Sequence, residues 1–274
     1  MSPSRRPNPM PSDPLYERAY RLGLYGLTAA WSEVSGQPWV EALILREEKE
    51  RHDRSQGRRI KRARIGRFKN MADFDWSWPK DVDREQIEEL FGFEFLETDN
   101  ANVIFFGPNG VGKTMLAQNL AYQAILRGHT VRMTTASELL NDLAAQDSTA
   151  SLQRRLRQYI QPRLLIIDEL GYLSYDARHA DLLFEVITRR HQDKSTLVTT
   201  NRAFKDWHET FPNASCVVTL VDRLIHKSEI IKIEGESYRL KEAKERAAEK
   251  AKARQSRRRS RPSKTKEADD AGRA

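Results

Sequence analysis

The chain has 274 residues, and its 47 Lys and Arg against 39 Asp and Glu leave a net charge of +8 at pH 7. This length is enough for one or two domains with a hydrophobic core. The single cysteine, Cys216, excludes an intramolecular disulfide, and no apolar run reaches the roughly 18 to 20 residues that a membrane-spanning helix needs. We therefore expect a cytoplasmic protein without a membrane partner.

The charge is distributed unevenly along the chain. Residues 1–70 carry a net charge of +7, residues 71–238 carry −7, and residues 239–274 carry +8. Two basic ends around an acidic centre are expected if the ends contact a polyanion, although solvation alone would explain part of this pattern.

The first 70 residues are predicted to be helical after a short disordered start. Residues 1–14 are rich in Pro and Ser and are expected to be disordered. From Leu15 onward, apolar residues recur at helical spacing, and Asp13 and Pro14 are the expected cap and first-turn residue of a helix. A second helix is predicted from Pro38, and the basic segment GRRIKRARIGRF follows it. Residues 15–70 are thus predicted to be a small helical domain that binds DNA or a partner protein.

Residues 58–69 contain seven basic side chains, and on a helix several of them would share one face. Such a face suits contact with the phosphates of duplex DNA, and the segment lacks the interleaved aromatic side chains of a single-strand binding surface. A solvated linker helix is the alternative interpretation. The candidate DNA-binding residues are Arg58, Arg59, Lys61, Arg62, Arg64, Arg67 and Lys69.

Residues 71–241 are predicted to form an α/β domain. After a segment rich in aromatic residues, MADFDWSWPKD, which is expected to dock on the next domain, strands are predicted at 102–106, 130–134, 164–168 and 196–200. Helices are predicted at 114–127, 136–145, 152–159 and 179–192. Strands that alternate with helices indicate a parallel sheet with helices on both faces. Residues 242–274 begin with a helix-compatible composition and continue as a polar, basic tail that we expect to be disordered.

The segment from Gly107 to Thr114, GPNGVGKT, matches the complete P-loop motif between a predicted strand and a predicted helix. In a P-loop, backbone N–H groups and a helix N-terminus surround the phosphates. We expect Lys113 to reach the β- and γ-phosphates of ATP and the Thr114 hydroxyl to bind Mg²⁺. A glycine-rich turn without a ligand is the alternative. The candidate nucleotide-binding residues are Gly107, Pro108, Asn109, Gly110, Val111, Gly112, Lys113, Thr114 and Met115.

A second motif, LLIIDE, places two acids at the carboxyl end of a buried strand, where ligands bind in open α/β sheets. We expect Asp168 to hold Mg²⁺ through water and Glu169 to act as the general base. A strand is predicted between the P-loop strand and this one, as in ATPases that use a hydrolytic glutamate. Asn201, after the strand TLVTT, is expected to orient water and the γ-phosphate. Two solvated acids and an ordinary strand-end Asn are the alternatives.

The segments GPNGVGKT, LLIIDELGYL, LVTTNR and VDRLIHKSEIIKIEGESYRL, with the basic helix followed by FDW, together resemble the IstB-like ATP-binding proteins. These proteins assist the transposition of insertion sequences and are related to DnaC-type helicase loaders. The resemblance covers residues 15–241. It implies an AAA+ ATPase fold, a homo-oligomer with ATP at the subunit interfaces, DNA binding, and delivery of target DNA to an IstA-like transposase.

The resemblance also assigns a role to Arg223, in the sequence VDRL. This residue resembles the family's arginine finger, which reaches the γ-phosphate held by a neighbouring subunit. An ion pair of the adjacent Asp222 with a basic neighbour is the alternative use of this segment. Arg239, in SYRL, is a further candidate for phosphate contact.

These patterns predict an ATP-dependent regulator of DNA transposition that assembles on duplex DNA and is reset by ATP hydrolysis. The candidate catalytic residues are Lys113, Glu169, Asn201 and Arg223. Two alternatives remain open. A DnaC-like helicase loader would prefer single-stranded DNA, and an architectural DNA-binding protein would use ATP only as a structural ligand.

Overall fold

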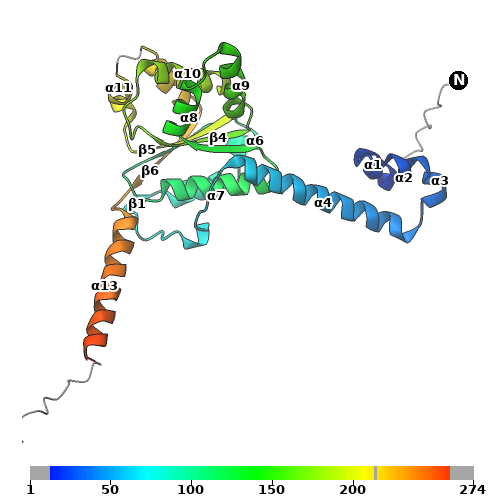
Figure 1. Ribbon diagram of the computed structural model, residues 1–274, viewed down its shortest axis with the longest axis horizontal. Helices are drawn as coiled ribbons and strands as arrows, with labels where there is room; N and C mark the ends of the chain where they lie inside the picture. Colours follow the sequence, from blue (N-terminus) through cyan, green and yellow to red (C-terminus); the bar gives the residue numbers. More distant parts are fainter. Residues whose placement is uncertain (1–12, 213–214, 260–274) are drawn as a thin grey trace, which may run out of the picture.

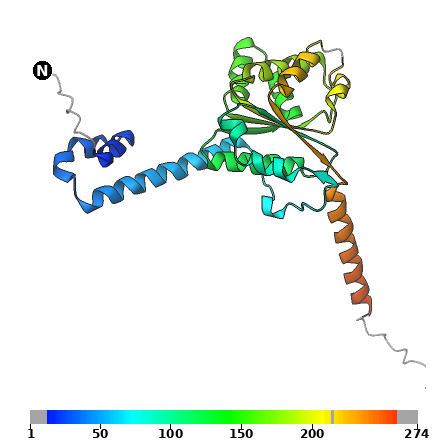
Figure 2. The same ribbon diagram turned by 180° about the vertical axis from the view of Figure 1, so that it is seen from behind.

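The computed structural model describes residues 13–212 and 215–259. Figures 1 and 2 show an α/β body from which two long helices, α4 and α13, extend in different directions. In these two ranges, no helix is both long enough and apolar enough to cross a membrane.

The body is built on a six-stranded sheet in the order β1-β6-β2-β5-β4-β3. Only β1 is antiparallel to its neighbour, and the other strand pairs are parallel. The parallel arrangement agrees with the prediction, because the predicted strands alternate with helices. The strands are β1 (Asp81–Val82), β2 (Asn102–Phe106), β3 (Val131–Thr135), β4 (Leu164–Leu170), β5 (Ser195–Thr200) and β6 (Ser228–Glu234).

Helices cover both faces of the sheet (Figure 1). Along β4, Leu164 and Ile166 pack into the core on one face, whereas Leu165 and Ile167 pack into the core on the other, as strand periodicity requires. The first face carries α5 (Arg84–Leu90), α6 (Glu94–Glu97) and α7 (Lys113–Leu126). The second carries α8 (Ala136–Ala144), α9 (Thr149–Ile160), α10 (Ala177–Arg190), η2 (Phe204–Asp206), α11 (Trp207–Thr210) and α12 (Val217–Ile225).

The N-terminal helices form a small separate core. Helices α1 (Pro14–Arg21), α2 (Tyr25–Ala29) and α3 (Trp31–Val34) pack on the first half of α4 (Pro38–Ala63) around Trp31, Val40 and Ile44. The predicted cap is confirmed, because the Asp13 carboxylate accepts the backbone N–H of Leu15 at 2.9 Å. It also accepts the indole N–H of Trp31 at 3.0 Å, which ties the start of α1 to α3.

Helix α4 differs from the two segments predicted, because it runs without a break for 26 residues, through Gly57. It ends where Arg64 adopts a left-handed conformation, with φ of 57°. Beyond it Ile65 is buried in the core, and its carbonyl accepts the Gln118 side chain of α7 at 2.8 Å. The basic residues 58–69 therefore do not share one helix face, since the last of them follow the helix.

The C-terminal part contains one strand that periodicity does not predict, β6, and one long helix, α13 (Tyr238–Arg259). Helix α13 agrees with the helix-compatible composition at the start of the basic tail, which is rich in Ala, Glu, Lys and Arg. Residues 260–274, and residues 1–12 at the other end, lie outside the described residues.

Candidate nucleotide-binding site

The P-loop joins the end of β2 to the start of α7, as the sequence predicts. Its glycines are required by close packing. A Cβ added to Gly107 would lie 2.0 Å from the carbonyl oxygen of Ile233. Gly112 has φ of +101°, and a Cβ added there would lie 2.6 Å from the ring of Phe74. The loop therefore wraps tightly at the N-terminus of α7, where the helix dipole favours an anion.

Lys113 lies at the centre of the loop and is only 4% exposed. Its ammonium donates to the carbonyl oxygens of Gly107 and Pro108, both at 2.7 Å. The pKa of Lys113 is lowered to about 8, chiefly by burial and also by the nearby Arg239, while Asp168 and Glu169 oppose the shift. A buried cation of this kind is suited to meet phosphate oxygens, because their negative charge would restore its pKa.

Three side chains from three elements meet at the carboxyl ends of β4 and β5. The Thr114 hydroxyl donates to Asp168 Oδ1 at 3.1 Å, and the Thr199 hydroxyl donates to the same carboxylate oxygen. Asp168 is 5% exposed, so these hydrogen bonds hold a buried carboxylate beside the P-loop. The sequence predicts Thr114 and Asp168 but not Thr199, whose only signal is its place near the end of an apolar strand.

Glu169 is placed by an irregularity in β4. The register between β4 and β5 shifts after Ile167, and Glu169 has a left-handed backbone with φ of 61°. Its N–H donates to the Thr199 hydroxyl at 3.0 Å. In a regular strand two successive side chains point to opposite faces. The irregularity therefore lets Asp168 meet Thr114 while Glu169 lines the nucleotide cavity.

The residues at this point fit a magnesium ion. Thr114 and Asp168 supply oxygen donors in direct contact with each other, and oxygen is the ligand that Mg²⁺ prefers. The described residues contain no cluster of three or more His, Cys, Asp and Glu side chains that would hold a metal on its own. In nucleotide sites, Mg²⁺ takes its other ligands from phosphates and water.

The cavity beside the P-loop has a volume of about 580 Å³. Its walls come from the P-loop and the start of α7, from the connector, which we define as residues 64–80, and from the start of α13. The predicted residues that line it are Asn109, Gly110, Val111, Gly112, Lys113, Thr114 and Met115, together with Glu169. Arg67, Lys69 and Arg239 also line it, although the first two are predicted as DNA-binding residues.

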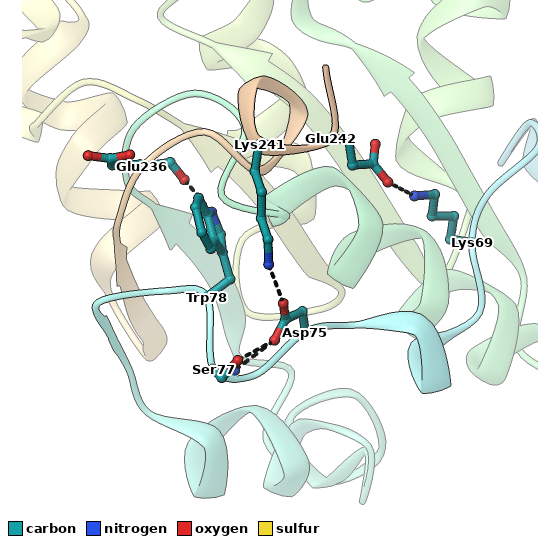
Figure 3. Close-up of polar contacts among 7 residues, drawn as sticks. All are labelled: Lys69, Asp75, Ser77, Trp78, Glu236, Lys241 and Glu242. Carbon is teal, nitrogen blue, oxygen red and sulfur yellow. Dashed lines mark hydrogen bonds and ion pairs between the residues drawn. The ribbon is translucent and has the colours of Figure 1, made fainter. Parts of the chain in front are cut away.

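The connector and the start of α13 close one side of this cavity through polar contacts, shown in Figure 3. Lys241 pairs with Asp75 at 3.0 Å, and Lys69 pairs with Glu242 at 2.6 Å. The indole N–H of Trp78 donates to the carbonyl of residue 236 at 2.9 Å. Hydrogen bonds from Ser77 and Lys241 lower the pKa of Asp75. The sequence does not predict this contact, which we call the connector–α13 contact.

Gly107, Pro108 and Asp168 do not line the cavity themselves but contact Lys113 or Thr114, which do, and two further candidate residues, Asn201 and Arg223, also lie outside the lining. Asn201 follows β5, and its buried side-chain oxygen has no hydrogen-bond partner in the described part of the chain. Arg223 lies on α12, where its guanidinium donates to Thr188 and stands 4.7 Å from the ring of Phe184. Neither residue contacts the nucleotide cavity of its own chain, and Asp222 forms no ion pair with a described residue.

Comparison with known proteins identifies relatives of this chain. The chain is similar to the ATP-binding protein of insertion sequence IS5376 from Geobacillus stearothermophilus, with 34% identity over 83% of this chain and 94% of the relative. It is similar to the ATP-binding protein of insertion sequence IS21 from Pseudomonas aeruginosa, with 37% identity over 78% of this chain and 80% of the relative.

Among solved structures, the fold is similar to that of DnaI, with a TM-score of 0.50 and 20% identity over 63% of this chain and 91% of that chain. The body thus has the AAA+ fold. The family described as "IstB-like ATP binding protein" matches residues 19–247. With a P-loop and an acidic strand end in the arrangement that ATP requires, this chain belongs to the family of IstB-like ATP-binding proteins of insertion sequences.

Proposed function

We propose that this protein is an ATP-dependent, DNA-binding regulator of transposition. In this proposal it assembles on duplex target DNA with ATP between subunits and delivers that DNA to a partner transposase, and ATP hydrolysis resets the assembly. The observation that carries the proposal is that Lys113, Thr114 and Glu169 line one cavity and that Asp168 is hydrogen-bonded to Thr114 beside it, in a chain whose relatives belong to insertion sequences.

Each residue of the site has a distinct task in hydrolysis. Lys113 and the P-loop amides hold the phosphates and balance their charge. Thr114 and Asp168 would hold Mg²⁺, which would polarise the γ-phosphate. Glu169 takes a proton from the attacking water, and its exposed position on the cavity wall gives that water access.

Asn201 and Arg223 complete the site in the proposed assembly. The buried, unpartnered oxygen of Asn201 is a free acceptor near the end of β5 and suits the orientation of a water molecule. Arg223 lies outside the nucleotide cavity of its own subunit, as is required of a residue that acts on the γ-phosphate bound by a neighbouring subunit. An arginine supplied in trans makes hydrolysis depend on assembly.

The proposal is tested by measuring ATP hydrolysis and binding to duplex DNA in the presence of ATP, ADP or no nucleotide. We expect turnover, and tighter binding to duplex with ATP than with ADP. A preference for single-stranded DNA would favour a helicase loader instead, and binding without turnover would favour an architectural protein. Stimulation of strand transfer by the transposase of the same insertion sequence tests the delivery step.

Mixing two inactive variants tests the trans role of Arg223. Arg223→Ala subunits keep an intact P-loop, and Lys113→Ala subunits keep the arginine. Mixed assemblies should therefore regain part of the hydrolysis that each variant lacks alone. Failure to regain activity at every mixing ratio would contradict a role in trans.

A further inference from the structure

A second cavity, of about 910 Å³, lies between the end of α4, the start of β3 and the end of α9. Five of the seven predicted DNA-binding residues line it, and two arginines of the ATPase domain form the opposite wall. None of the described residues that line it is acidic. We call this cavity the basic groove and define it by Arg58, Arg59, Lys61, Arg62, Arg64, Arg132 and Arg157.

The positive charge of the groove is not neutralised by the protein. Upstream on α4, Arg51 and Arg54 pair with Glu47 and Glu50 one turn earlier. From Ser55 to the end of the helix there is no acidic residue, and none of the seven groove residues forms an ion pair with a carboxylate of residues 13–212 and 215–259. Like charges held together without a counter-charge repel each other, so an anion in the groove relieves that repulsion.

Two of the groove arginines also have unsatisfied donors. The Nε atoms of Arg59 and Arg132 are buried and have no hydrogen-bond partner among the described residues. Other contacts hold these two side chains in place. Arg59 donates through Nη1 to the Ser55 hydroxyl at 2.9 Å, and the Arg132 guanidinium lies 5.6 Å from the centre of the Tyr159 ring. Buried donors without an acceptor are unfavourable, and phosphate oxygens are the acceptors that arginine forks fit best.

The shape of the groove favours a nucleic-acid backbone in duplex form. The charges that line the groove come from three elements, the end of α4, β3 and α9, and not from a single loop or helix end. None of the described residues that line the groove is aromatic, and Tyr159, whose ring Arg132 contacts, is 2% exposed and not available for stacking with bases. Contacts to phosphates without base stacking are typical of sequence-independent duplex binding.

We propose that the basic groove is the duplex DNA site and that Arg132 and Arg157 form its second wall. This inference rests on the proposed DNA-binding function and deepens it in two ways. It places the phosphates between α4 and the ATPase domain, whereas the sequence alone predicts that a single basic helix face contacts them. It also assigns Arg67 and Lys69 to the nucleotide cavity instead of to DNA.

The test compares two double variants of the full chain that lose the same charge. Arg132→Gln with Arg157→Gln removes the second wall. Arg154→Gln with Lys205→Gln removes two exposed cations outside the groove, one of them on the same helix, α9. Affinity for a 30-base-pair duplex of arbitrary sequence is measured by fluorescence anisotropy at several salt concentrations, and ATP affinity is measured in parallel to verify folding.

We expect the groove variant to bind duplex roughly tenfold more weakly and to lower the slope of log affinity against log salt by about 2, because two phosphate contacts are lost. The matched control should keep the slope of the wild type. Because Arg132 packs on Tyr159, Arg58→Gln with Arg62→Gln on the opposite wall provides a second variant and should give the same loss.

The outcomes separate this inference from the function on which it rests. Wild-type affinity in both groove variants, or an equal loss in the control, would overturn the groove assignment while leaving DNA binding intact. Tighter binding to a single strand of the same length would overturn the duplex assignment. A wild-type protein that binds no duplex at all would overturn the proposed DNA-binding function and this inference with it.

Discussion

The nucleotide cavity and the basic groove both lie beside the connector, yet they are built differently. The nucleotide cavity uses backbone amides and one buried lysine, and Lys113 is held by two carbonyl oxygens of the loop. The groove uses guanidinium groups, of which Arg58, Arg62 and Arg157 are exposed. A site of rigid backbone and buried charge recognises one phosphate arrangement, whereas exposed long side chains adapt to many.

The connector runs between the two sites and links them. Arg64 lines the groove, and five residues later Lys69 lines the nucleotide cavity. Two side chains of α7 fix this stretch, since Gln118 donates to the carbonyl of Ile65 and Asn119 to that of Lys69. The segment between the sites is thus attached to the helix that carries the P-loop. Variants at each site test how independent the two sites are.

A variant of the P-loop lysine separates the two sites. Lys113→Ala removes the only lysine of the P-loop and should weaken ATP binding by roughly a hundredfold or more, because charge-assisted contacts to the phosphates are lost. Titration calorimetry with ATP measures this. Binding of duplex DNA at low salt without nucleotide should remain within about twofold of the wild type, since distant sites act additively. The exposed Lys205→Ala is the control, and normal ATP affinity in Lys113→Ala would contradict the P-loop assignment.

A second variant separates binding from chemistry inside the nucleotide cavity. Glu169→Gln should keep ATP affinity but slow hydrolysis by roughly 10²- to 10⁴-fold, the usual contribution of a general base. Single-turnover hydrolysis measures the chemical step. Glu236→Gln is the matched control, because this exposed glutamate lies near α13 but does not line the cavity. Wild-type turnover in Glu169→Gln would show that another group is the base.

The sites should also differ in their response to pH. The pKa of Lys113 is about 8 in the free protein, and bound phosphates favour the charged form. Binding therefore takes up a proton, and ATP affinity should fall roughly tenfold between pH 7 and pH 9 as the free lysine loses its charge. The groove relies mainly on guanidinium groups, which as a class do not lose a proton in this pH range, so duplex affinity should be nearly constant.

Calorimetry in buffers of different ionisation enthalpy detects the proton uptake directly. Lys113→Arg is the control, because a guanidinium does not titrate in this range and ATP affinity should then lose its pH dependence. The same fall in affinity in Lys113→Arg would show that Lys113 is not the group that titrates.

The sequence predicts most of the nucleotide site because the residues of each motif are close together in the chain and lie next to a predicted strand or helix. Gly107 to Thr114 are contiguous, and Asp168 and Glu169 follow a buried strand, so strand, loop and helix order suffices to place them. The contact of Trp78 with residue 236 spans 158 positions, and the pair of Lys69 with Glu242 spans 173. No local pattern records contacts at such separations.

The basic residues 58–69 also show that local sequence does not predict contacts made by the fold. Composition identifies residues 58–69 as cationic, but the left-handed backbone at Arg64 and the burial of Ile65 divide the run between two cavities. Where a helix ends depends on its tertiary packing as much as on its residues. Arg132 and Arg157 lie on β3 and α9, far from the run in sequence, so only the fold brings them to the groove.

The smallest expected effect concerns the connector–α13 contact. Asp75→Asn removes the ion pair with Lys241 and should speed nucleotide release by about two- to fivefold, because partly exposed pairs contribute little. Stopped-flow fluorescence with a labelled ATP analogue measures the release. Asp73→Asn is the matched control, since Asp73 lines the same cavity but forms no ion pair with a described residue. Duplex affinity should not change in either variant, because neither aspartate lines the groove. Equal release rates in both variants would mean that the Asp75–Lys241 pair does not retain the nucleotide. A change in duplex affinity confined to Asp75→Asn would mean that the connector transmits the state of one site to the other.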